Sequence, residues 1–209
     1  GFDFWARCLF DDSMTKASNA QTKTAIAFKE WAVIVDLLGS GDQILILRKG
    51  GIHEKRGGFQ VEHSEFLLFP TLFHQQRKSV VPPAQARCDE ILPRFSDPAT
   101  VPIEYWVHAV ETRQVADWRR IEKLAPHHAW TEAVIRDRFG WGEDEGIFVI
   151  AARVFRLADP KVVPVLKEYG GCKSWVDLGG AAPSFDGMKP VLDQHVFDRT
   201  LDEIRSLLG

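Results

Sequence analysis

The residues best suited to chemistry lie where an apolar stretch ends at Leu47. Arg48, Lys49, Gly50 and Gly51 follow directly, and residues 48–58 contain four cations and four glycines. Glycines let a ligand approach the backbone N–H groups, and neighbouring cations favour a phosphate or a carboxylate. The spacing differs from the GxxxxGK[ST] motif of P-loops, so no particular nucleotide is implied. The alternative is a solvated hairpin turn.

A second polar group follows the next apolar stretch, which ends at Phe69. Thr71, His74 and Gln75 carry side chains that can hydrogen-bond a ligand, although His74 and Gln75 could instead cap a helix. Arg153 ends another apolar stretch (VIAAR, 149–153) much as arginine ends ILILR at 44–48. Because buried strands end on these groups, we expect the strand ends to deliver side chains to one site.

Two aromatic clusters could extend this site. Trp130, between His128 and Thr131, could stack on a planar ligand, an interaction that contributes about 1–3 kcal/mol per nucleic-acid base. The alternative is a core tryptophan at the start of a helix. Lys173 and Trp175 follow a Gly-Gly turn, which we interpret as part of a binding surface or as a purely structural turn.

Evidence for catalysis is weaker. His63 or His74 could act as a general base, and Cys172 as a nucleophile would need such a base beside it. No HxH or HExxH spacing indicates a metal site, and no D…[DE]xK pattern of a two-metal nuclease lies on successive strands. We assign no catalytic residue and expect neither a metal nor a cofactor.

Composition restricts the class of protein. With 209 residues, 45% of them hydrophobic, the chain can form one large domain with a substantial core. Its net charge of −3 excludes a wholly basic surface, so nucleic-acid contact would need a local patch. Three separated cysteines argue against a disulfide framework. Since no apolar stretch approaches the roughly 20 residues of a membrane span and the start lacks a signal-peptide pattern, we expect a cytoplasmic protein without a membrane partner.

The elements that must position these residues follow from hydrophobic periodicity. We expect a polar lead-in at 1–24, a single α+β domain at 25–180 and a linker with an amphipathic helix at 181–209. Three prolines mark a junction between two halves near 93–102, and the pair at 82–83 should break any helix. The expected order is a helix at 25–38, strands at 43–47, 61–69 and 103–115, helices at 117–124 and 130–139, a strand at 147–157, and a helix at 190–208.

Several segments together resemble a bacterial family, the domain of unknown function 1802. The matching stretches are KEWAVIVDLL (29–38), ILILRKGGIHE (44–54), FLLFPTLFHQ (66–75), HHAWT (127–131), ARVFRL (152–157) and YGGCKSWVDL (169–178). They cover most of residues 25–180 in order. Members of this family sometimes occur fused to, or beside, restriction-endonuclease domains. The resemblance therefore implies a role in nucleic-acid processing or defence, with an endonuclease-type partner.

A second resemblance concerns the fold. Residues 41–48 (GDQILILR) are similar in spacing to the GxKxxExR motif of ASCH domains, a branch of the PUA-like superfamily, and the later order of elements is also similar. Gln43 stands where that motif has lysine, and Ile46 where it has glutamate. The resemblance thus implies a ligand-binding barrel, while the two replacements argue against ASCH-type amidohydrolase activity.

We therefore predict a mixed α+β domain: a curved sheet or partly open β-barrel flanked by helices, with PUA-like architecture. The predicted function is recognition of DNA, RNA or a nucleotide without chemistry of its own. An enzyme and a protein-interaction module are the alternatives, and the sequence does not indicate an oligomeric state. The ligand-binding residues are expected to be Arg48, Lys49, Gly50, Gly51, Thr71, His74, Gln75, His128, Trp130, Thr131, Arg153, Lys173 and Trp175.

Overall fold

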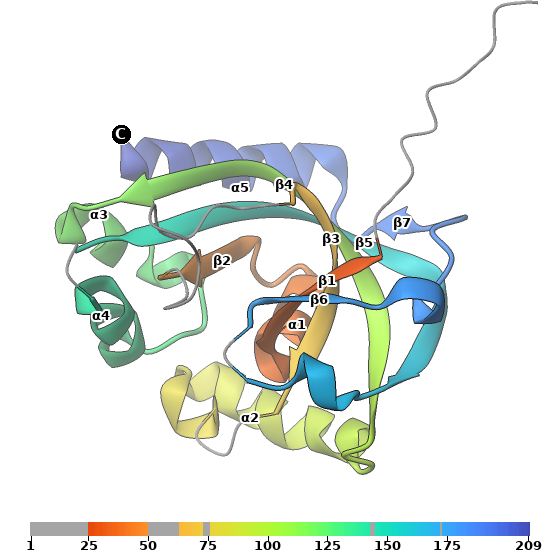
Figure 1. The fold of residues 1–209 in the computed structure, drawn as a ribbon. Helices are drawn as coiled ribbons and strands as arrows, with labels where there is room; N and C mark the ends of the chain where they lie inside the picture. Colours follow the sequence, from red (N-terminus) through yellow and green to blue (C-terminus); the bar gives the residue numbers. More distant parts are fainter. Residues whose placement is uncertain (1–24, 50–62, 73–75, 143–144, 172) are drawn as a thin grey trace, which may run out of the picture.

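A single curled sheet organises the chain (Figure 1). The computed structural model describes residues 25–49, 63–72, 76–142, 145–171 and 173–209. The strand order is β2-β5-β4-β3-β1-β6, with β7 paired to β5, and every pair is antiparallel except β1 with β3. The strands are β1 Ile26–Trp31, β2 Leu45–Arg48, β3 Glu65–Thr71, β4 Thr100–Val115, β5 Ile147–Pro164, β6 Trp175–Asp177 and β7 Lys189–Pro190.

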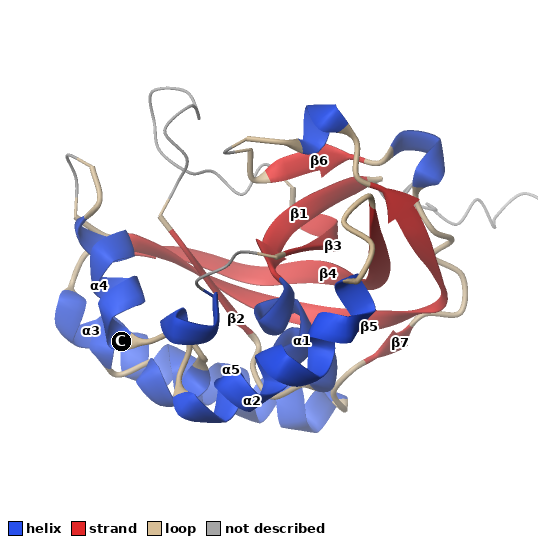
Figure 2. Cartoon of the chain, turned by 90° about the horizontal axis from the view of Figure 1, so that it is seen from below, coloured by secondary structure: helices blue, strands red, loops and turns tan. Residues whose placement is uncertain are grey.

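The α-helices gather on one side of this sheet, and β6 lies on the other (Figure 2). They are α1 Ala32–Ser40, α2 Pro82–Ile91, α3 Trp118–Glu122, α4 Glu132–Gly140 and α5 Gln194–Leu208. Short 3-10 helices cover Gln76–Ser79, Leu92–Phe95, Ala125–His127, Lys167–Tyr169 and Gly179–Ala181. The predicted α+β class with a strongly curled half-barrel sheet is confirmed. Of the helices described, none is both long and apolar enough to cross a bilayer.

Each face of the central strands packs on a separate core. Phe28 on β1 and Leu68 on β3 belong to the larger core, which the helices complete, while Ala27 and Leu67 belong to a smaller core on the opposite face. This division follows from the alternation of side chains along a strand. Apolar residues therefore stand next to each other in β1 (IAFKEW), which explains why this strand lacks an alternating apolar–polar pattern.

The predicted helix at 25–38 is wrong in its first half. Residues 26–31 form β1, between β3 and β6, and only from Ala32 does the chain become helical. The proline pair at 82–83 begins α2 instead of breaking it, because the first turn of a helix needs no N–H from proline. Side chains cap two of the helices: Asp117 accepts from the backbone N–H of Arg119 at the start of α3, and Thr131 accepts from the backbone N–H of Val134 at the start of α4.

Candidate anion-binding site

The curl of the sheet brings one edge strand, β2, against the opposite edge. Arg48, the last residue of β2, donates a hydrogen bond from Nη2 to the carbonyl of Lys29 on β1 at 3.2 Å. The same nitrogen lies 3.4 Å from the hydroxyl of Ser174, directly before β6. The half-barrel is open between β2 and the edge formed by β1 and β6, and this gap is called the seam below. The side chain of Arg48 bridges the seam, in place of a ladder of backbone hydrogen bonds.

A buried carboxylate lies directly below this seam. The side chain of Glu30 is fully buried; its Oε1 accepts from the backbone N–H of Trp31 at 2.7 Å, and its Oε2 lies 3.9 Å from Nη1 of Arg48. Thr71, at the end of β3, donates from its hydroxyl to the backbone carbonyl of Glu30 at 3.0 Å. The ends of β2 and β3 thus meet through β1, although the two strands are not neighbours in the sheet.

A second guanidinium group, which the sequence did not reveal, comes from the last turn of α4. Arg138 donates from Nη1 to the carbonyl of Leu47 at 2.8 Å, and its guanidinium carbon lies 5.0 Å from the ring centroids of both Trp31 and Trp130. Burial lowers the pKa of Arg138 to about 10, while the charge of Glu30 opposes this shift. The group is therefore still protonated at neutral pH, and cation–π contact with two indoles stabilises it in place.

Aromatic rings form the surroundings of the two arginines. The guanidinium of Arg48 lies 4.9 Å from the ring centroid of Phe28, which contacts Trp175 at 4.8 Å, and His63 meets Trp175 edge-on at 5.2 Å. Within the described residues, the indole N–H groups of Trp130 and Trp175 are buried without a hydrogen-bond partner, as is Oε2 of Glu30. Unsatisfied buried polar atoms are rare in folded proteins, and Nδ1 of His128, which lines a separate cavity, is a further one.

Within the described residues, the two guanidinium groups face a single carboxylate. The ammonium of Lys49, the residue after β2, donates to the carbonyl of Phe139 at 3.1 Å. Arg138 forms no ion pair with any carboxylate of the described residues. This cluster of Glu30, Arg48, Lys49 and Arg138 is called the arginine cluster below.

Several predicted site residues have other surroundings. His128 is buried beside Trp130, with ring centroids 5.8 Å apart, but it lines a separate cavity of about 340 Å³ next to α2. Thr131 caps α4. Arg153 lies within β5, which continues to Pro164, so the expectation that it ends a strand is wrong; its side chain packs on Phe197 of α5, away from the seam.

Lys173 also points away: its ammonium lies 3.4 Å from the carbonyl of Glu168. Of the predicted residues, the structure therefore brings together Arg48, Lys49, Thr71, Trp130 and Trp175. Gly50, Gly51, His74 and Gln75 lie outside the described residues, as does Cys172.

The positions compared with the ASCH motif have structural roles. Gln43 is buried; its amide donates to the carbonyl of Leu45 at 2.7 Å and its oxygen accepts from the N–H of Ala129 at 3.1 Å. Ile46 is a fully buried core residue. Gln43 and Ile46 thus place no reactive side chain where the ASCH motif has lysine and glutamate. The described part of the chain also contains no group of three metal-ligating side chains.

Comparison with known families gave one match. The model of a family described as a domain of unknown function (DUF1802) matches residues 27–203, which include every element from β1 to most of α5. Comparisons with curated proteins and with solved structures gave no match. PUA-like architecture accordingly stays a prediction.

Proposed function

We propose a function from the geometry of the site itself, because the chain belongs to the DUF1802 family, a domain whose function is unknown. The proposed function is recognition of nucleic acid or a nucleotide, without chemistry of its own. The observation that carries it is the arginine cluster: two guanidinium groups converge on one buried carboxylate beside tryptophan rings.

The charges in the cluster favour an added anion. Glu30 can compensate one guanidinium, and it lies closer to Arg48 than to Arg138. A half-buried guanidinium without its own carboxylate gains more from an anion than an exposed one, because water screens it less. Arginine also presents several N–H donors in one plane, which match the oxygen atoms of a phosphate.

Aromatic rings beside the cations make a nucleotide a better match than a simple anion. Trp175 and His63 lie at the seam near Arg48, and neither is fully buried. Base–aromatic stacking is tolerant of sequence, since every base presents a flat face. A site of this type would bind the phosphate on arginine and a base on the neighbouring rings.

A purely structural role is the main alternative. An ion pair between Glu30 and Arg48 could simply hold the seam of the half-barrel together. That role does not require Arg138, which has no carboxylate partner of its own among the described residues and loses solvation in this position. A restriction-endonuclease partner rests on the family resemblance alone and stays a prediction.

Binding of fluorescently labelled single-stranded DNA and RNA, followed by anisotropy at several salt concentrations, tests the proposal. Replacing Arg138→Gln should weaken binding about 10- to 100-fold, since a hydrogen bond to a charged group contributes about 1.5–3 kcal/mol. Arg136→Gln is the matched control: Arg136 lies on the same helix, but its side chain is 56% exposed and pairs with Glu132. We expect that variant to bind within twofold of the wild type.

Affinity should also fall as salt rises, because phosphate binding releases counterions. Absence of nucleic-acid or nucleotide binding at low salt would refute the proposal. Equal binding by a folded Arg138→Gln variant would refute the assignment to this site, and thermal unfolding of each variant establishes that it is folded.

A further inference from the structure

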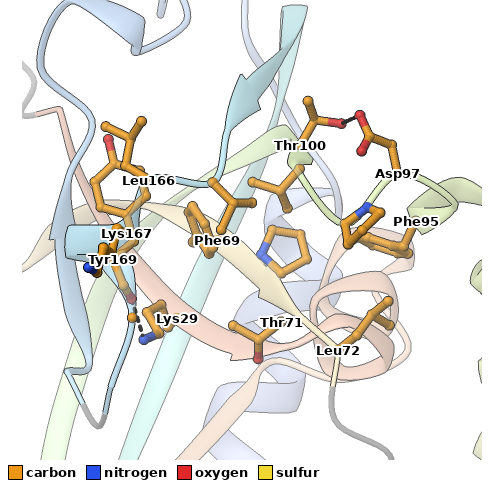
Figure 3. Close-up of a pocket in the computed structure, with 15 residues that line it drawn as sticks. Lys29, Phe69, Thr71, Leu72, Phe95, Asp97, Thr100, Leu166, Lys167 and Tyr169 are labelled. Carbon is orange, nitrogen blue, oxygen red and sulfur yellow. Dashed lines mark hydrogen bonds between the residues drawn. The ribbon is translucent and has the colours of Figure 1, made fainter.

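The opposite face of β1 borders a cavity with a volume of about 500 Å³ (Figure 3). Glu30 on β1 points to the arginine cluster, whereas the neighbouring Lys29 lines this cavity. The cavity lies beyond the end of β3, between the start of β4 and the segment that follows β5. The two sites share Thr71, but Glu30 and Lys29, which belong to one site each, lie on opposite faces of β1.

Apolar side chains form most of this cavity. Phe69 and Tyr169 belong to the smaller core and continue its surface into the opening. Of the large hydrophobic residues that are exposed in the described chain, three line this one cavity: Leu72 (50%), Val165 (42%) and Leu166 (40%). Exposed apolar side chains gathered at a concave surface are typical of a ligand-binding site.

Two lysines lie at one end of the cavity. The ammonium of Lys29 donates to the carbonyls of Tyr169 at 2.8 Å and Gly171 at 3.0 Å, which hold it at the wall. Lys167 lies on the same side of the cavity (Figure 3). The carboxylate of Asp97, on the opposite side, accepts from the N–H of Ala99 and from another side chain of its own loop.

We propose that this cavity binds a small organic acid with an apolar body. The body, aromatic or aliphatic, would contact Phe69 and Leu166, and its acidic group would lie at the end of the cavity where Lys167 lies. A volume of about 500 Å³ is within the range of sites for drug-sized molecules. This function goes beyond nucleic-acid recognition and uses a different face of the sheet.

Two fluorescent probes test both parts of the proposal on the full chain. The anion 8-anilinonaphthalene-1-sulfonate should bind saturably at one site, and Leu166→Glu should weaken it at least tenfold by placing a negative charge at the mouth. Val110→Glu is the matched control, because Val110 is 41% exposed but lies in the other half of β4 from the cavity. That variant should bind the probe as the wild type does.

The charged end is tested with Lys167→Gln. It should weaken the sulfonate probe about threefold and leave the uncharged analogue N-phenyl-1-naphthylamine unchanged. Non-saturable binding of the sulfonate probe, or equal effects of Leu166→Glu and Val110→Glu on it, would refute the proposed binding site. If Lys167→Gln weakened the binding of both probes equally, the proposal that the ligand is an acid would be refuted. Arg138→Gln should leave the sulfonate probe unaffected, so that failure of this site is distinguishable from failure of nucleic-acid binding.

Discussion

Burial of His128 should make the stability of this protein depend on pH. The residue is only 8% exposed, and burial, with a smaller effect of the nearby Arg138 charge, lowers the pKa of His128 from 6.5 to about 4. In the unfolded chain the imidazole would take up a proton near its ordinary pKa. The folded state therefore binds this proton more weakly than the unfolded state.

The sign and size of the effect follow from proton linkage. Above about pH 6.5, His128 is neutral in both states and stability does not depend on it. As pH falls from about 6.5 to about 4, the unfolded state is stabilised by protonation, so the free energy of unfolding decreases. The pKa difference corresponds to about 3 kcal/mol over this range.

Urea unfolding of the wild type and of His128→Gln, between pH 7.5 and pH 4, measures this contribution. The stability of the wild type relative to the variant should decline by about 3 kcal/mol toward pH 4. A second variant, His195→Gln, removes an exposed histidine on α5 and should reproduce the wild-type pH dependence. If the difference between the wild type and His128→Gln is constant across this range, the reasoning from burial is wrong.

Three further substitutions test other contacts. Glu30→Gln should lower the free energy of unfolding in urea by about 3 kcal/mol, because it removes the carboxylate that pairs with Arg48 in the described part of the chain. It should also tighten oligonucleotide binding in the anisotropy assay, and unchanged stability would contradict this reasoning. Thr131→Ala should cost about 1 kcal/mol in the same unfolding assay by removing the cap of α4. Gly39→Ala should lower the thermal midpoint despite its better helix propensity, since the new methyl group would clash with the Tyr105 ring.

Much of the fold was predictable because it depends on local patterns. The apolar stretches that contain Arg48 and Arg153 lie in strands as expected, although β5 continues beyond Arg153 to Pro164. The first half of the helix predicted at 25–38 was wrong because a strand with apolar residues on both faces has no distinctive period. What makes residues 26–31 a strand is pairing with β3 and β6, and β6 lies about 150 residues later in the chain.

The site was predictable only in part for a similar reason. Arg48 and Thr71 follow apolar strands, so the rule that strand ends collect polar groups identified both. Arg138 carries no local signal, since it enters the cluster only when α4 packs against the end of β2. Glu30 and Trp31 belonged to the segment that was predicted as a helix, so their position at a strand end was not foreseen.

The position of β1 also has a consequence for the order of folding. Its neighbours β3 and β6 come from distant parts of the chain, and Lys29 contacts the carbonyl of Tyr169, 140 residues away. During synthesis, β1 can pair on one side once β3 has emerged, but its other edge stays open until residues 175–177 follow. Contacts between such distant segments slow folding, because a long loop must close before they form. The seam that Arg48 bridges should therefore be among the last parts of the protein to assemble.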